Sequence, residues 1–301
     1  MKQTELDLQD RTFKCAPGLR GPLLVLDCHY LCHRAFHSQR GLSWDGVPTG
    51  VVYGFLKSIR ALKNEFQTDR IAFCFESRQL LRKSIFPEYK ARRSRKDDEP
   101  EKVDARDELR RQIEDLKLLH LPRIGFANVF SAPGFESDDL MAALALRERD
   151  VVLVTSDADL YQCLSPSVRM HCPTSRRLFT EKWFINEYGI PPRKWALVKA
   201  IAGCKGDGVP GVEGIGETTA LKFIRGDEIT HPKGAREKIL SSKDDICRNR
   251  RLVELPFFGT PVPRLRVDRV SRKGWDEVCK QLGFRSLMGR PPIYSHANLL
   301  T

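Results

Sequence analysis

Short apolar runs alternate along the chain with longer stretches in which apolar residues recur every three or four positions. The runs at 23–26, 71–75 and 151–155 are uninterrupted and rich in aliphatic and aromatic residues, which is typical of strands buried on both faces. The stretches at 50–66 and 136–148 have the length and period of helices. Strands that alternate with helices predict an α/β domain built on a mainly parallel sheet.

A sharp change in charge marks a segment that does not suit a packed core. Residues 78–96 carry eight Lys or Arg against one acid, whereas 97–108 carry seven acids against two bases. We therefore expect an exposed segment that crosses the mouth of the sheet and returns as a helix over 104–119.

The second half of the chain contains a glycine-rich stretch. Two prolines at 191–192 suit a helix start, and the glycines of 203–216 predict an irregular loop before a helix resumes at Glu217. From Leu255 onward we expect strand-like pieces and a helix near 275–282.

Composition and charge narrow the class of protein. The 301 residues are 41% hydrophobic and 30% charged, and no apolar run approaches the ~20 residues of a membrane-spanning helix, so we expect no membrane protein. The opening residues lack the apolar core of a signal peptide, and the nine cysteines follow no regular framework, which favours reduced thiols in a cytoplasmic protein. The net charge of +12 favours a polyanionic partner, most simply nucleic acid.

Acidic residues follow the predicted strands. Asp27, Glu76 and Asp157 come directly after the three apolar runs, and the carboxyl ends of parallel strands meet at one edge of a sheet. An acid after a strand is often only a helix cap, and this alternative applies to Asp139 and Asp157. The remaining acids of the set are Glu136, Asp138, Asp139, Asp159 and Asp207.

So many carboxylates near one edge repel one another and require protons or cations. Hard oxygen ligands suit Mg²⁺ or Mn²⁺, and the number of acids exceeds the need of one ion. Two ions at such a site activate a water and stabilise the leaving oxygen of a phosphodiester. The pattern therefore predicts phosphodiester hydrolysis without a covalent enzyme intermediate.

A second group of metal-binding residue types lies at Cys28, His29, Cys32, His33 and His37. Their spacing puts the two cysteines on one helical face and the histidines along another, without the intervening loop of a zinc finger. We interpret them as helix packing and surface histidines rather than as a zinc site.

Six segments, in this order, resemble the flap endonuclease family, and most closely the phage and bacterial 5′–3′ exonucleases, including the nuclease domain of bacterial DNA polymerase I. The segments are 24–27, 34–37, 86–93, 134–139, 155–162 and 211–220. The resemblance spans about 21–287.

The resemblance implies a PIN-like nuclease domain at 21–190 with a helical arch at about 78–115. It further implies a helix-hairpin-helix type DNA-binding region at 191–255 and a C-terminal segment, 256–301, that packs back on the nuclease core. Residues 1–20 fall outside it and form an N-terminal extension. The metal ligands that it implies are Asp27, Glu76, Glu136, Asp138, Asp139, Asp157, Asp159 and Asp207.

Lys90 and Arg93 match the positions at the base of the arch that contact the scissile phosphate, and Arg34 is a further candidate. A charge run is otherwise most often a solvated face. The adjoining Tyr89 favours the functional interpretation, because an aromatic ring beside two cations can stack a terminal base.

The glycine-rich loop matches the hairpin of the family, where backbone amides before a helix bind phosphate without reading sequence. A tight structural turn is the alternative interpretation. Family members often bind K⁺ there. The residues concerned are Gly211, Gly214, Gly216, Thr218, Thr219 and Lys222.

Four residues depart from the family pattern. Cys204 replaces a carboxylate of the metal site, and a thiol is a poor ligand for Mg²⁺, so the second ion is expected to bind less tightly. Glu76 replaces an Asp, and the pair Cys28 and His29 replaces smaller residues after Asp27.

The sequence thus predicts a monomeric, structure-specific 5′ nuclease that acts on branched or 5′-flapped DNA, or on RNA–DNA flaps, with two Mg²⁺ or Mn²⁺ ions. Two alternatives stay open: a catalytically weak protein that binds branched DNA, because of Cys204, and an RNA-cleaving PIN-type nuclease.

Overall fold

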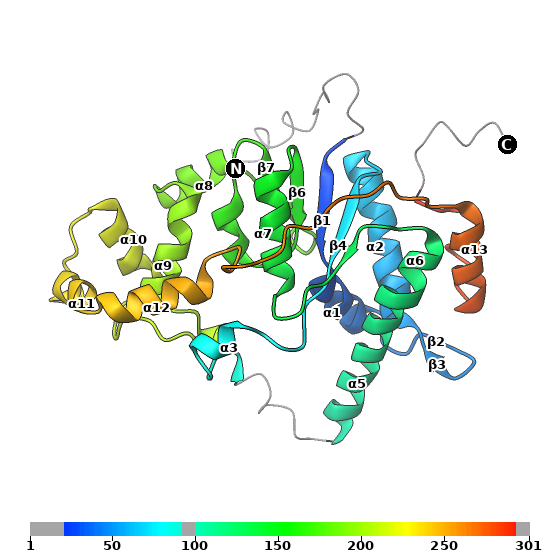
Figure 1. Ribbon diagram of the computed structural model, residues 1–301, viewed down its shortest axis with the longest axis horizontal. Helices are drawn as coiled ribbons and strands as arrows, with labels where there is room; N and C mark the ends of the chain where they lie inside the picture. Colours follow the sequence, from blue (N-terminus) through cyan, green and yellow to red (C-terminus); the bar gives the residue numbers. More distant parts are fainter. Residues whose placement is uncertain (1–20, 92–99, 293–301) are drawn as a thin grey trace, which may run out of the picture.

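A six-stranded sheet forms the centre of the protein in the computed structural model, which describes residues 21–91 and 100–292 (Figure 1). The strand order is β5-β4-β1-β6-β7-β8, and every neighbouring pair is parallel except β7 with β8. The predicted mainly parallel sheet is therefore confirmed. The strands are β1 (Leu23–Asp27), β4 (Ile71–Cys74), β5 (Val129–Phe130), β6 (Val151–Val154), β7 (Val168–Cys172) and β8 (Arg177–Phe179).

Side chains of the central strands alternate between two cores. Leu23 and Val25 of β1 belong to the core on one face of the sheet, whereas Leu24 and Leu26 belong to the core on the other. Both sets are almost fully buried. An uninterrupted apolar run is required because a strand that is covered on both sides has no solvent face.

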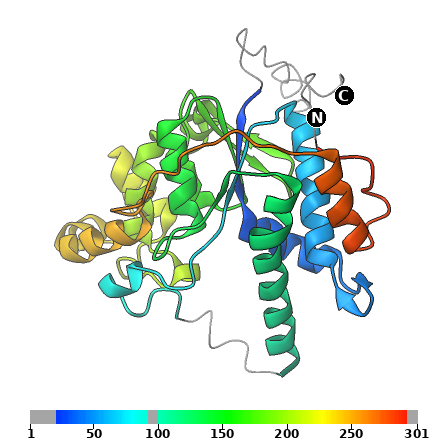
Figure 2. The ribbon, with the colours of Figure 1, turned by 45° about the vertical axis from the view of Figure 1, so that its right-hand side comes forward.

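Helices cover both faces, as the turned view shows (Figure 2). One core is closed by α1 (Cys28–Ser38), α2 (Gly50–Phe66), α5 (Pro100–Asp115), α6 (Leu121–Ile124) and α13 (Arg272–Gln281). The other is closed by α7 (Ser137–Arg147), α8 (Glu181–Tyr188), α9 (Trp195–Ala202), α10 (Glu217–Arg225) and α11 (Ala235–Ser241). The helices predicted at 50–66, 136–148 and from Glu217 match α2, α7 and α10.

Two helices lie in the segment that the resemblance assigns to an arch: α3 (Arg82–Ile85) and α5, which projects from the body of the molecule (Figures 1 and 2). The helix expected over 104–119 is interrupted in the structure, because a π-helical turn η2 (Leu116–His120) joins α5 to α6. A small hairpin of β2 (Ser43–Trp44) and β3 (Val47–Pro48) lies between α1 and α2.

The glycine-rich loop lies between α9 and α10 and contains the short 3₁₀ turn η5 (Lys205–Asp207). Gly203 has a positive φ of 80°, and a β-carbon on Gly211 would lie 2.2 Å from the carbonyl oxygen of Ala202. The two glycines therefore permit a close backbone approach that larger residues would prevent. Other short 3₁₀ elements are η3 (Ala158–Cys163) and η4 (Pro192–Lys194).

The last described segment returns toward α6 and β5 after α12 (Lys243–Val253). Between α12 and α13 the described residues contain no strand, which differs from the strand-like pieces expected after Leu255. This segment is held by individual hydrogen bonds to residues 125 and 127 instead: Asp268 Oδ1 accepts from Ala127 N, and Arg269 N donates to Gly125 O. None of the described helices is long and apolar enough to span a membrane.

Candidate active site

A polar cavity of about 460 Å³ opens at the carboxyl edge of the sheet. Its walls come from the ends of β1, β4 and β6, from the first turns of α1 and α7, and from Lys90 at the base of the arch. The structure therefore brings together acids that are far apart in the sequence, as the strand ends predict. The carboxylates that line the cavity are Asp27, Glu76, Glu136, Asp138 and Asp157.

Asp27 ends β1 and caps α1. Its Oδ1 accepts from Tyr30 N at 3.0 Å, and its Oδ2 accepts from the hydroxyl of Thr155 at 3.0 Å. Burial, with a smaller effect of the nearby Asp157, raises the pKa of Asp27 to about 6 despite these hydrogen bonds. An acid with a raised pKa in a cleft is typical of a functional site.

Asp138 lies on the first turn of α7. Its Oδ1 is buried and has no hydrogen-bond partner in the described part of the chain. Burial raises the pKa of Asp138 well above its usual value, and the neighbouring Asp27, Asp157 and Glu136 raise it too. A buried oxygen without a donor requires an explanation, and a cation supplies one.

Asp139 follows directly in the chain but has a different environment. Arg82 donates to both of its oxygens, at 2.6 and 2.7 Å, and the backbone N–H groups of Glu136 and Phe257 donate to it as well. The side chain is completely buried. Asp139 was expected to be a metal ligand, and the structure corrects that expectation, because its oxygens already bind the guanidinium and the start of α7.

Lys90 lies among the acids. Its ammonium forms a close ion pair with Glu136 and lies 3.9 Å from both Glu76 and Asp207. Although burial opposes ionisation of both groups, the contact raises the pKa of Lys90 and lowers that of Glu136. Lys90 thus holds a positive charge inside the cavity.

Tyr89 does not have the role that the sequence suggested. It is only 2% exposed, and its hydroxyl donates to Glu136 Oε2 at 2.8 Å. A ring this deeply buried has no free face on which a terminal base can stack, so the expectation of base stacking is corrected. Tyr89 instead supports the acid and packs beside Arg82.

A second group of acids lies next to the cavity. Asp159 follows Asp157 by two residues, and its carboxylate lies 3.6 Å from the ammonium of Lys199. The thiol of Cys204 lies 3.9 Å from Asp159 Oδ2. Burial and the adjacent Asp159 raise the pKa of the Cys204 thiol, so it stays protonated at neutral pH.

Two histidines that we had interpreted as structural also line the cavity. His29 and His33 come from α1, and Nδ1 of His29 accepts from the backbone N–H of Glu76 at 3.1 Å. Burial lowers the pKa of His29 to about 4, with smaller effects of the same sign from His33 and Lys117. The cysteines Cys28 and Cys32 are buried in the core, as expected.

These residues fit divalent cations that prefer oxygen. The donor set is almost entirely carboxylate, and the orphaned Asp138 oxygen needs a positive partner. Among the described residues, no three acids, histidines or cysteines converge on one point. The ammonium of Lys90 is paired with Glu136 in this arrangement.

Comparison with known proteins decides the family. Residues 22–189 match the model of the 5′–3′ exonuclease N-terminal resolvase-like domain. A thermostable DNA polymerase I of Thermus thermophilus is 31% identical over 290 residues, which are 89% of this chain and 33% of that polymerase. The chain belongs to the 5′–3′ exonuclease family. It spans about a third of the length of the curated polymerases that it matches.

Solved structures agree with the exonuclease fold. A 5′-exonuclease of phage T5 with bound zinc gives a TM-score of 0.66 at 22% identity, over 78% of this chain and 89% of that one. A T5 flap endonuclease in complex with DNA and metal ions gives 0.65 at 20% identity, over 86% and 94%. The predicted family and the PIN-like fold are confirmed.

The hairpin loop of this exonuclease-family chain presents its glycines at the surface. Gly211, Gly214 and Gly216 line a shallow cavity of about 490 Å³. Thr218 is exposed on the first turn of α10, and Thr219 and Lys222 are half-buried on the same helix. Glu217 connects this turn to the acids, because Lys199 lies 3.2 Å from Glu217 Oε2 as well as close to Asp159.

Two predicted arginines lie elsewhere. Arg34 is exposed on α1 and does not line the acidic cavity. Arg93 lies outside the described residues. Arg82 is a site residue that the sequence analysis missed, since nothing in a basic run indicates which side chain will be buried against Asp139.

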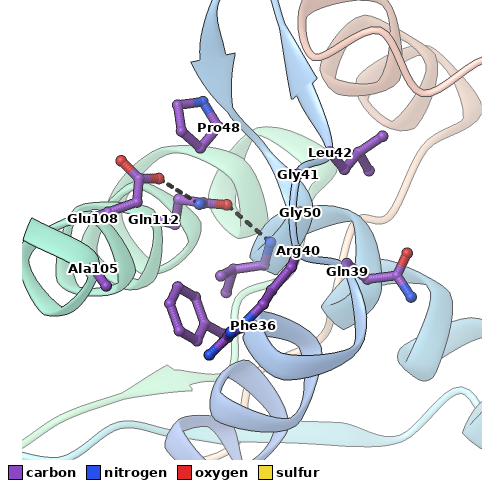
Figure 3. A pocket seen from close by; sticks show the side chains of 11 residues that line it. Phe36, Gln39, Arg40, Gly41, Leu42, Pro48, Gly50, Ala105, Glu108 and Gln112 are labelled. Carbon is purple, nitrogen blue, oxygen red and sulfur yellow. Dashed lines mark hydrogen bonds between the residues drawn. The ribbon is translucent and has the colours of Figure 1, made fainter. Parts of the chain in front are cut away.

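The arch helix is anchored to the core by Gln112, which is almost fully buried. Figure 3 shows that Gln112 extends from α5 toward the start of α2, where its Oε1 accepts from Val51 N at 3.0 Å. Its amide nitrogen donates to Glu108 of the same helix. The base of α5 therefore has a fixed position beside a cavity of about 450 Å³ that Phe36 and Arg40 also line.

Proposed function

We propose that this chain is a structure-specific 5′ nuclease, which hydrolyses DNA phosphodiesters near the 5′ end of branched or flapped DNA with two Mg²⁺ or Mn²⁺ ions. One observation carries the proposal. Five carboxylates surround one cavity at the carboxyl edge of the sheet, and a buried oxygen of Asp138 lacks a partner in the described structure.

The acids divide into two groups that would hold the two ions. Asp27, Glu76, Glu136 and Asp138 belong to the first, and Asp157 lies between the groups because it lines the cavity and adjoins Asp159. The second group would be Asp159 and Asp207 with the weak ligand Cys204. When bound, the ions would activate the attacking water and stabilise the leaving oxygen.

The protein's own cations act on the substrate. Lys90 supplies a positive charge at the cavity, where it would meet a phosphate as negative charge develops. Arg93 and Arg34 are proposed as further phosphate contacts at the arch. The Arg82 and Asp139 pair holds the start of α7 rigid, so that Glu136 and Asp138 keep their positions.

The hairpin loop is proposed as the grip on duplex DNA. Backbone amides around Gly211, Gly214 and Gly216 would bind phosphate oxygens, with Thr218, Thr219 and Lys222 adding side-chain contacts. K⁺ bound by carbonyl oxygens of this loop is part of the proposal. Phosphate contacts predict weak sequence preference and strong salt dependence.

The proposal also includes the oligomeric state of the chain and its division into domains. The chain acts as a monomer, because a single strand end enters a single cavity. It is divided into the nuclease domain at 21–190, the DNA-binding region at 191–255 and the returning C-terminal segment. The described part of that region shares a core with the sheet, since Val212 and Ile215 pack in the same cluster as Val25.

A labelled 5′-flap DNA tests the function. We expect cleavage near the branch with Mg²⁺ or Mn²⁺, and none in EDTA. Binding of branched DNA without cleavage in either metal would favour the alternative of a catalytically weak binding protein, for which the protonated Cys204 is the relevant observation. Faster cleavage of an RNA strand than of the matched DNA strand would favour an RNA-cleaving nuclease.

A further inference from the structure

His29 occupies the second position of α1, two residues after Asp27, and lines the acidic cavity. The first turn of this helix is fixed by the cap that Asp27 provides. On its other side the ring contacts Phe75 edge to face, with centroids 6.1 Å apart. The imidazole is thus held by its surroundings rather than free to rotate.

One hydrogen bond determines which ring nitrogen of His29 carries the proton. The backbone N–H of Glu76 donates to Nδ1 at 3.1 Å. A backbone N–H cannot accept, so Nδ1 must present its lone pair, and the proton of the neutral ring lies on Nε2. Glu76 itself is one of the proposed metal ligands, so the same hydrogen bond connects the ring to a residue of the proposed metal site.

The remaining donor of His29 is Nε2–H. Other residues that line the same cavity also have hydrogen-bond donors. Lys90, Lys117 and His33 are the charged or basic side chains that act on the ring electrostatically, and Lys90 and His33 line the same cavity. Acids of β1, α7 and β6 form the rest of the wall. An N–H donor in a cavity that also holds the ammonium of Lys90 can add a hydrogen bond to an anion that Lys90 attracts.

We propose that His29 is a substrate-binding residue of this nuclease, whose Nε2–H donates to a non-bridging oxygen of the DNA phosphate in the cavity. This inference rests on the proposed function. A neutral donor adds a directed hydrogen bond to the charge of Lys90 without adding a second buried cation. It also connects recognition of phosphate to the position of Glu76, through the bond at Nδ1.

Two amide substitutions separate this role from a purely structural one. In His29→Gln the amide nitrogen reaches the place of Nε2, so a donor to phosphate is kept while the acceptor for Glu76 N is lost. In His29→Asn the carbonyl oxygen takes the place of Nδ1, so the bond from Glu76 is kept while the phosphate donor is lost. His37→Asn makes the same change on the exposed end of α1, away from the cavity.

The four proteins are compared by single-turnover cleavage of a 5′-flap DNA and by affinity for that DNA in EDTA. We expect His29→Asn to cleave about ten- to hundredfold more slowly than wild type and to bind several-fold more weakly. His29→Gln should stay within about threefold of wild type in both, and His37→Asn should equal wild type. Thermal melts of all four confirm that each is folded.

Equal cleavage and binding by His29→Asn and wild type would overturn the proposal. A greater loss in His29→Gln than in His29→Asn would also overturn it, since that order shows that the bond to Glu76 is what matters. If wild type itself does not cleave, the proposed function fails, while DNA affinity in EDTA still ranks the variants and decides the role of His29.

Discussion

Asp138 and Asp139 are neighbours on one helical turn, yet their carboxylates have opposite surroundings. Asp139 is neutralised by the guanidinium of Arg82 and accepts four hydrogen bonds. Asp138 has a buried oxygen without a partner and three acids nearby that raise its pKa. The comparison shows that the charge of a residue does not make it a metal ligand. A buried carboxylate oxygen without a partner in the described structure, as in Asp138, has the greater need of an external cation.

The strongest way to test this contrast is to neutralise Asp138. We expect Asp138→Asn to lower the single-turnover rate of flap cleavage about a thousandfold or more, because it removes a charged ligand for the proposed ions. The melting temperature in EDTA should not fall, since the substitution relieves repulsion with Asp27. A variant that cleaves at the wild-type rate contradicts the assignment of Asp138 as a ligand.

The same substitution at Asp139 should act on stability instead. Asp139→Asn removes the charged partner that binds both arms of the buried Arg82 and leaves it only the contact of 3.2 Å with Glu136, and breaking a buried pair costs about 3–5 kcal/mol. Urea unfolding in EDTA measures this loss. The double variant Arg82→Met with Asp139→Leu should recover much of it, because a buried pair can be replaced by apolar contacts. Full stability of Asp139→Asn alone would show that the pair is not structural.

Metal binding should depend on pH in a direction that the acids determine. The pKa of Asp27 is raised to about 6, so its contribution to stability is complete below about pH 4 and is lost as the pH rises through about 6 in metal-free protein. Mg²⁺ binds the ionised form and should restore stability at pH 8 far more than at pH 5. At a hundredfold excess over Kd the gain is about 2.7 kcal/mol. Melts in Mg²⁺ and in EDTA at both pH values measure it, and equal gains would contradict the prediction.

The smallest expected effect concerns the second group of acids. Cys204→Asp places a carboxylate beside Asp159 and should lower the Mg²⁺ concentration for half-maximal cleavage a few-fold. Cys247→Asp, an exposed position on α12, is the matched control. An unchanged or higher Mg²⁺ requirement in Cys204→Asp would show that the thiol does not weaken the site.

The sequence predicts the fold well for a physical reason. Buried parallel strands need uninterrupted apolar runs, and their carboxyl ends share an edge, so the meeting of Asp27, Glu76 and Asp157 follows from local pattern alone. The resemblance to the exonuclease family then supplies the function.

The ion pairs and hydrogen bonds inside the site could not be predicted from the sequence. Arg82 lies 57 residues from Asp139, and only tertiary packing shows that it is the buried member of a basic run. Tyr89 beside two cations suggested stacking, but its depth in the core is likewise a tertiary property. His29 was interpreted as a surface residue because its bond to Glu76 N crosses between two strand ends.

The acidic cavity draws its walls from five stretches of chain that lie between Asp27 and Ala158. No excised peptide can reproduce it, and a polypeptide that has not yet added β6 lacks one side entirely. Capture of a divalent ion is therefore a signal that assembly has finished. A nascent chain emerging from the ribosome lacks the proposed metal site until β6 has joined the sheet.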